Sequence, residues 1–70
     1  MMPLLLAQVG ESGLIRHVGG TPEVKRHLED LGFVVGASVT IISRVGSNVI
    51  VKVKESRLAI DERMAQKIMV

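Results

Sequence analysis

Apolar and charged residues follow a helical spacing over one short stretch of the chain. The apolar positions lie at i, i+4 and i+7, namely Val24, Leu28 and Leu31. Thr21 suits the N-cap and Pro22 the first helical position, so we predict a helix over residues 22–31. Gly32 follows at the point where many helices end in the left-handed conformation. We therefore expect a positive φ at Gly32, with Phe33 packing back onto the apolar stripe.

Two β-rich runs over residues 39–45 and 49–53 are separated by turn residues at 46–48. They predict a hairpin with a loop of those turn residues. Strict alternation places one set of side chains on the inward face: Val39, Ile41, Val45, Val49, Val51 and Val53. It places the other set on the outward face: Thr40, Ile42, Arg44, Ile50, Lys52 and Lys54. The inward face should enter the core.

Shorter patterns surround these elements. They predict a first strand over 14–18, a third meander strand over 57–60, a short helix over 62–66 capped by Asp61, and a closing strand at 68–70. In the first strand, alternation turns Leu14 and Val18 inward, with Ile15 and His17 pointing the other way. Short strands with little helix favour a closed barrel, because closure removes exposed strand edges. The predicted fold class is mainly β with one or two short helices, in a small barrel of about five strands.

The chain is short for a domain that must fold by itself. A chain of 70 residues buries only about 60% of its unfolded surface, so we expect a single domain over residues 1–70. The predicted core collects the inward positions of all elements: Leu14, Val18, Val24, Leu28, Leu31, Phe33, Val39, Ile41, Val49, Val51, Val53, Leu58, Ile60 and Ile68.

Composition excludes several classes of chemistry. Cysteine is absent, which excludes disulfides, iron–sulfur clusters, thiolate zinc sites and a cysteine nucleophile. Phe33 is the only aromatic residue, so stacking platforms for single-stranded nucleic acid are missing. The net charge is +2 and the charges alternate, so neither a nucleic-acid patch nor a membrane patch is indicated. The apolar run at 1–7 lacks a basic leader and is too short to span a bilayer, so we expect it to lead into the fold of a cytoplasmic protein.

Recognisable catalytic and cofactor motifs are missing. The segment 10–13 lacks the Lys-Ser/Thr ending of a phosphate-binding loop, and no serine nucleophile signature is present. We therefore assign no catalytic residue and no cofactor. His17 and His27 are the only candidate metal ligands, to which Glu23 or Asp30 could add a carboxylate. No known ligand spacing links them, so we expect weak metal binding or none.

The chain carries more apolar residues than one small core requires. Hydrophobic residues make up 47% of it, and its mean hydropathy is +0.38. Ile42 and Ile50 share the predicted outward hairpin face with cations. Such a mixed face is typical of a protein-binding surface where the domain's own segments leave it uncovered. The predicted partner-binding residues are Val35, Ile42, Arg44, Ile50, Lys52 and Met64.

Three segments, in order along the chain, resemble the FeoA family. The run RHLEDLGFVVG at 26–36 is similar to the family pattern of a basic residue and leucine before a Leu-Gly step, with a second glycine shortly after. The run GLIRHVGG at 13–20 resembles the family's first strand and glycine pair, and the tail over 58–70 is similar to its closing segment. The chain departs from the pattern at Val35, where proline is usual, and in the turn at 55–56, where glycine is usual. A further departure is Asp61, which stands close to a usual basic position.

This resemblance implies an SH3-like barrel with a helical insertion. It also implies a small cytosolic accessory of bacterial ferrous iron uptake that acts with the membrane GTPase permease FeoB. A similar domain ends the iron- or manganese-dependent repressors of the DtxR type, but no helix-turn-helix precedes it here, so a free-standing protein is expected. The family motif consists of glycines and core aliphatics, so it carries over no catalytic or metal residue.

Two other functions stay open from the residues alone. One is a nucleic-acid-associated SH3-like module, which the missing aromatics and scattered charge disfavour. The other is a metal-binding regulatory domain that uses His17 and His27, which the missing ligand spacing disfavours. The resemblance and the apolar excess favour a non-enzymatic accessory that contacts a FeoB-like membrane GTPase, without nucleic acid and without direct membrane insertion.

Overall fold

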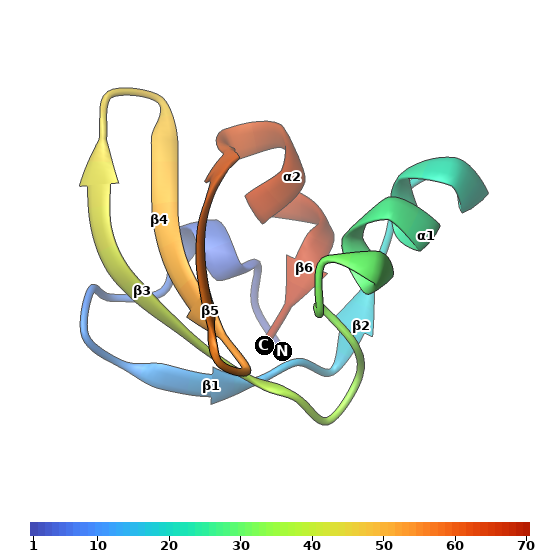
Figure 1. Cartoon of the computed structure of the whole chain (residues 1–70), viewed down its shortest axis with the longest axis horizontal. Coiled ribbons are helices and arrows are strands. Elements are labelled where there is room, and N and C mark those ends of the chain that lie inside the picture. The colour runs from blue at the N-terminus through green and yellow to red at the C-terminus, as the bar shows by residue number, and fades with distance from the viewer.

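Two antiparallel sheets and two short helices make up the computed structural model, which describes residues 1–70. In chain order the elements are the 3-10 helix η1 (Leu4–Leu6), β1 (Ser12–Leu14), β2 (His17–Val18), α1 (Pro22–Asp30), β3 (Ser38–Val45), β4 (Asn48–Val53), β5 (Ser56–Asp61), α2 (Glu62–Lys67) and β6 (Ile68–Met69). One sheet has the order β1-β3-β4-β5 and the other pairs β2 with β6 (Figure 1). The prediction of a mainly β fold with one or two short helices is confirmed, and the structure has six short strands where about five were predicted.

The predicted first strand is divided between the two sheets. β1 pairs with β3, whereas β2 pairs with β6. Between them the chain bends, and the amide of Ile15 donates to the carbonyl of Ala37 at 2.8 Å. The bend interrupts the alternation, so Ile15 is buried and Leu14 is 57% exposed. The prediction of Leu14 as a core residue was therefore wrong, whereas Val18, beyond the bend, is buried as predicted.

Helix α1 has the predicted cap at each end. The Thr21 hydroxyl accepts a hydrogen bond from the amide of Val24 at 3.3 Å. After the helix, Gly32 has a φ of +110°, and the amide of Phe33 donates to the carbonyl of Leu28 at 3.0 Å. This is the long hydrogen bond of a Schellman motif, which turns the chain back across the last helical turn. Leu28 and Phe33 are consequently both fully buried.

Strand β3 contains a bulge at Ile42. Ile41 pairs with Val51, but the next paired residue, Ser43, lies opposite Ile50. One extra residue is therefore inserted on β3, and two residues of the bulged strand oppose one on its partner.

The bulge reverses the alternation over the end of β3. Val45, predicted to face the core, is 59% exposed. Arg44, predicted to face outward, lies opposite the buried Val49 and therefore on the inward side of the sheet. The hairpin loop is also shorter than predicted, because Val45 pairs directly with Asn48 and only Gly46 and Ser47 connect them.

Lys54 occupies the left-handed region in the turn between β4 and β5, with a φ of +54°, and no other non-glycine residue has a positive φ. A side chain costs about 1–2 kcal/mol in that region. Allowing for the greater flexibility of glycine in the unfolded chain, we expect Lys54→Gly to raise the free energy of unfolding by about 0.5–1 kcal/mol. Urea denaturation followed by circular dichroism measures the change. Lys52→Gly, within β4, is the matched control and should lower the stability; a loss for both variants would contradict a strained turn.

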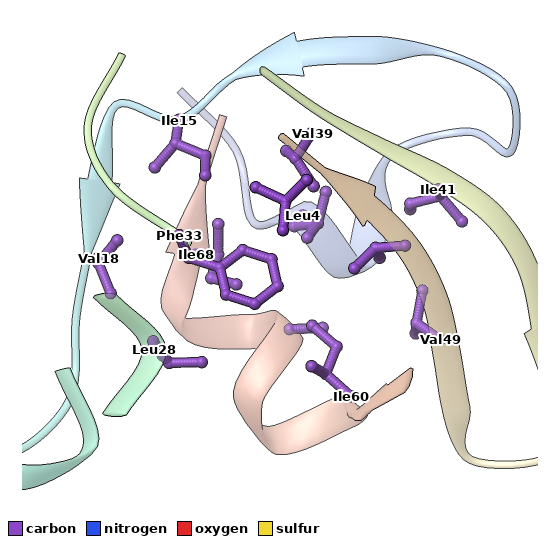
Figure 2. Close-up of a cluster of buried hydrophobic side chains, with 13 residues drawn as sticks. Leu4, Ile15, Val18, Leu28, Phe33, Val39, Ile41, Val49, Ile60 and Ile68 are labelled. Carbon is purple, nitrogen blue, oxygen red and sulfur yellow. The ribbon is translucent and has the colours of Figure 1, made fainter. Parts of the chain in front are cut away.

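The core consists of side chains from both sheets, both helices and the N-terminal segment (Figure 2). Its buried residues are Leu4, Ile15, Val18, Leu28, Phe33, Val39, Ile41, Val49, Val51, Val53, Ile60, Ala65 and Ile68. Val24, Leu31 and Leu58, also predicted as core, are partly buried and pack against it. Three buried residues, Leu4, Ile15 and Ala65, were not in the predicted core.

The two ends of the chain pair with each other. The amide of Met2 donates to the carbonyl of Val70 at 2.9 Å, and the amide of Val70 donates to the carbonyl of Met2 at 2.8 Å. The ends accordingly lie side by side in Figure 1. Just after this pair, Leu4 enters the core at 2% exposure, and η1 packs against α2. The N-terminal segment is thus part of the core and not only a lead-in to the fold.

Candidate functional site

We define the outer face as the side of the four-stranded sheet that points away from the core. Strand register arranges it in rows, one of which runs across all four strands through Ser12, Thr40, Lys52 and Arg57. Both helices bury residues in the core that the opposite side of this sheet also forms. The helices therefore pack on the inward side and leave the outer face uncovered by helix.

Half of the predicted partner-binding set lies together on the outer face. Ile50 and Lys52 are two residues apart on β4, and their side chains point to the same side. Ile42, as the bulged residue, lies opposite Ile50 together with Ser43. Both isoleucines are half-buried and are not among the residues that pack against the core, whereas Lys52 is exposed. Apolar surface and a cation are therefore adjacent here.

Arg44 lies elsewhere and has a structural partner. Its Nη2 donates hydrogen bonds to the carbonyls of Leu5 and Ala7, each at 2.7 Å. These carbonyls lie at the end of η1, where helical carbonyls lack partners within the helix. The prediction that Arg44 shares a face with the isoleucines is wrong, because the bulge turns it toward the N-terminal segment.

The other two predicted partner-binding residues are also separate from the isoleucines. Val35 is 68% exposed in the loop between α1 and β3. Met64 lies on α2, half-buried and packed against the core on the inward side. The outer face therefore does not include Met64.

A polar hollow of about 420 Å³ opens on the outer face. It is lined by Ser12, Ala37, Ser38, Thr40, Lys52 and Lys54. Of these residues, only Lys52 belongs to the predicted partner-binding set. The hydroxyl residues come together through the pairing of β1 with β3, which joins segments that are distant along the chain.

The two histidines lie on neighbouring elements, His17 on β2 and His27 on α1, and both are exposed. No group of three or more histidine, aspartate and glutamate side chains is arranged to hold a metal ion. Neither helix is long and apolar enough to cross a membrane.

The sequence as a whole matches one family model. That model is described as the FeoA domain, and it matches residues 2–70. The chain belongs to the FeoA family. A relative in Methanocaldococcus jannaschii, provisionally named Fe(2+) transport protein A, is 30% identical over 70 residues, which is 100% of this chain and 85% of the relative.

Solved FeoA structures have the same fold as this FeoA-family chain. The solution structure of FeoA from Chlorobium tepidum has a TM-score of 0.88 at 27% identity, covering 97% of this chain and 67% of the other. The crystal structure of Stenotrophomonas maltophilia FeoA complexed with zinc has a TM-score of 0.86 at 24% identity, covering 99% and 88%. The latter protein is described as a prokaryotic SH3 domain, so the predicted SH3-like architecture is confirmed.

Proposed function

We propose that this FeoA-family protein is a non-enzymatic accessory of ferrous iron uptake that works in the cytoplasm by contact with a FeoB-type membrane GTPase. Family membership and the name of the archaeal relative support the iron-uptake setting. The outer face supports action by protein contact, because it combines half-buried isoleucines with cations and no helix covers it. An apolar patch with a polar rim is the usual composition of a protein interface.

Titration of the isotope-labelled protein with the cytosolic part of a FeoB-type GTPase tests this function. We expect NMR shifts to cluster on residues 40–54 and to persist at high salt, because the isoleucines contribute the apolar contact and salt screens only the rim cations. Shifts confined to α1 would move the site, and no shifts at any salt would exclude the soluble GTPase portion as the partner. Larger, strongly salt-dependent shifts with nucleic acid would favour a nucleic-acid-associated module.

A pair of variants locates the contact. We expect Ile50→Asp to weaken GTPase binding by more than about tenfold, because it places a charge at the centre of the apolar patch. Leu6→Asp is the matched control, since Leu6 is an exposed apolar residue of η1 at 66% exposure. Equal affinities for the two variants would contradict docking through the outer face. A dispersed spectrum for each variant confirms that it is folded.

A further inference from the structure

The polar hollow on the outer face has an unusual lining for such an apolar chain. Ser12, Thr40 and Lys52 lie side by side across β1, β3 and β4. Ser38, at the start of β3, and Lys54, in the turn after β4, complete the polar lining. Every lining residue except Ala37 carries a hydrogen-bonding side chain, and none is acidic. The hollow is thus cationic and rich in donors.

The donors of the hollow are largely unused within the protein. The Ser12 and Thr40 hydroxyl oxygens lie 2.6 Å apart, so one hydroxyl donates to the other and the accepting hydroxyl keeps its own proton available. The remaining side-chain hydrogen bonds of the structure involve only Thr21, Arg44 and Asp61. Each lysine ammonium offers three donors. An oxyanion is the ligand that matches free hydroxyl and ammonium donors in one place.

Neighbouring charges maintain the positive character of this site. Arg57 on β5 lies opposite Lys52 in the strand register and adds a third cation to this side of the sheet. The nearest acids in sequence are Glu11, before Ser12, and Glu55, in the turn after Lys54, and neither lines the hollow. The lining itself therefore contains two ammonium groups and no carboxylate.

The form of the hollow favours a tethered anion over a free one. Gly13, which follows Ser12 in β1, does not leave space for an anion against the backbone. A Cβ atom placed on Gly13 would lie 3.2 Å from the Cβ of Val70. The donors identified in the hollow are side chains on an open sheet, and such exposed side chains bind a free ion only weakly. A carboxylate on a docked protein gains a high effective concentration from the adjacent apolar contact at Ile42 and Ile50.

We propose that the polar hollow is an oxyanion-binding site that receives the carboxylate of an aspartate or glutamate on the protein partner. Lys52 and Lys54 supply the charge, and the hydroxyls of Ser12, Ser38 and Thr40 orient the oxygens. The identity of the partner rests on the proposed function, whereas the chemistry of the hollow rests on its own residues.

A probe that needs no partner tests the hollow itself. We expect a short oligoglutamate peptide, titrated at low salt into the labelled full-length protein, to shift the amides of Ser12, Ser38, Thr40 and Lys52. Oligoglutamine should leave them in place. The double variant Lys52→Glu/Lys54→Glu should lose these shifts, and the control Lys25→Glu/Arg26→Glu, with the same change of charge on exposed residues of α1, should retain them. Shifts spread equally over all basic residues, or saturable binding of inorganic phosphate without any of the peptide, would overturn the proposal.

The same variants separate this proposal from the proposed function. With the cytosolic part of the GTPase, we expect the hollow variant to bind at least about tenfold more weakly than the control, because two attractive charge contacts become repulsive. Equal binding by both variants would overturn the hollow as a docking site while leaving the contact with the GTPase intact. If the peptide occupies the hollow but the GTPase does not bind, the oxyanion site stands and the choice of partner fails.

Discussion

Replacing Leu28 with alanine should lower the free energy of unfolding by about 2–5 kcal/mol. The Leu28 side chain is fully buried between α1 and the strands, and its carbonyl accepts the hydrogen bond from Phe33 that ends the helix. Truncation removes apolar burial and leaves a cavity beside the single aromatic ring of the core. A domain of this size has a total stability of about 4–10 kcal/mol, so the variant should melt far below the parent protein.

Leu14→Ala is the matched control for this variant. Both residues are leucines that the alternation pattern assigns to the core, but Leu14 is 57% exposed. We expect its truncation to change the stability by about 0.5 kcal/mol or less. Circular dichroism is the suitable probe, because the chain has no tryptophan or tyrosine. Similar losses for the two variants would show that the division of the first strand is wrong.

Replacing Leu4 with alanine should also cost about 2–5 kcal/mol, although Leu4 lies next to the chain terminus. Terminal residues are usually poorly ordered unless they are tied down. Here the Met2–Val70 hydrogen bonds and the two bonds from Arg44 hold the segment in place, and the Leu4 side chain is 2% exposed. Denaturant unfolding of the variant measures the contribution of this segment.

Leu6→Ala provides the comparison within the same short helix. Leu6 is 66% exposed, so its truncation should leave the stability almost unchanged. If neither variant loses stability, the N-terminal segment does not belong to the cooperative core. If both lose it equally, the segment is buried in another orientation.

Local signals in the sequence were sufficient for α1 and for most of the meander. The helix has its N-cap, its apolar stripe and its terminal glycine within a dozen residues, so no distant contact is needed to locate it. The three omitted core residues depend on distant packing instead. In the run of leucines at 4–6, contact with α2 and β6 determines which side chain is buried. Likewise, Ile15 is buried because its amide bonds to the α1–β3 loop.

The candidate site was predictable only as far as the alternation held. Ile50 and Lys52 lie on β4, which has no bulge, and they have the predicted orientation. No glycine or proline marks the bulge at Ile42, so the reversal that redirects Arg44 could not be read from the residues near it. The polar hollow depends on the register between β1 and β3, which brings Ser12 next to Thr40, 28 residues further along the chain.

The paired chain ends make this fold suited to insertion within a longer polypeptide. Met2 and Val70 lie side by side on antiparallel backbone segments that are joined by two hydrogen bonds. The chain of a host protein could connect to Met2 on one side and continue from Val70 on the other, and the two connections would start from adjacent points. Domains with adjacent ends are tolerated as insertions for this reason. The sheet that carries the polar hollow could then be added to another protein without separating the elements on either side of the insertion point.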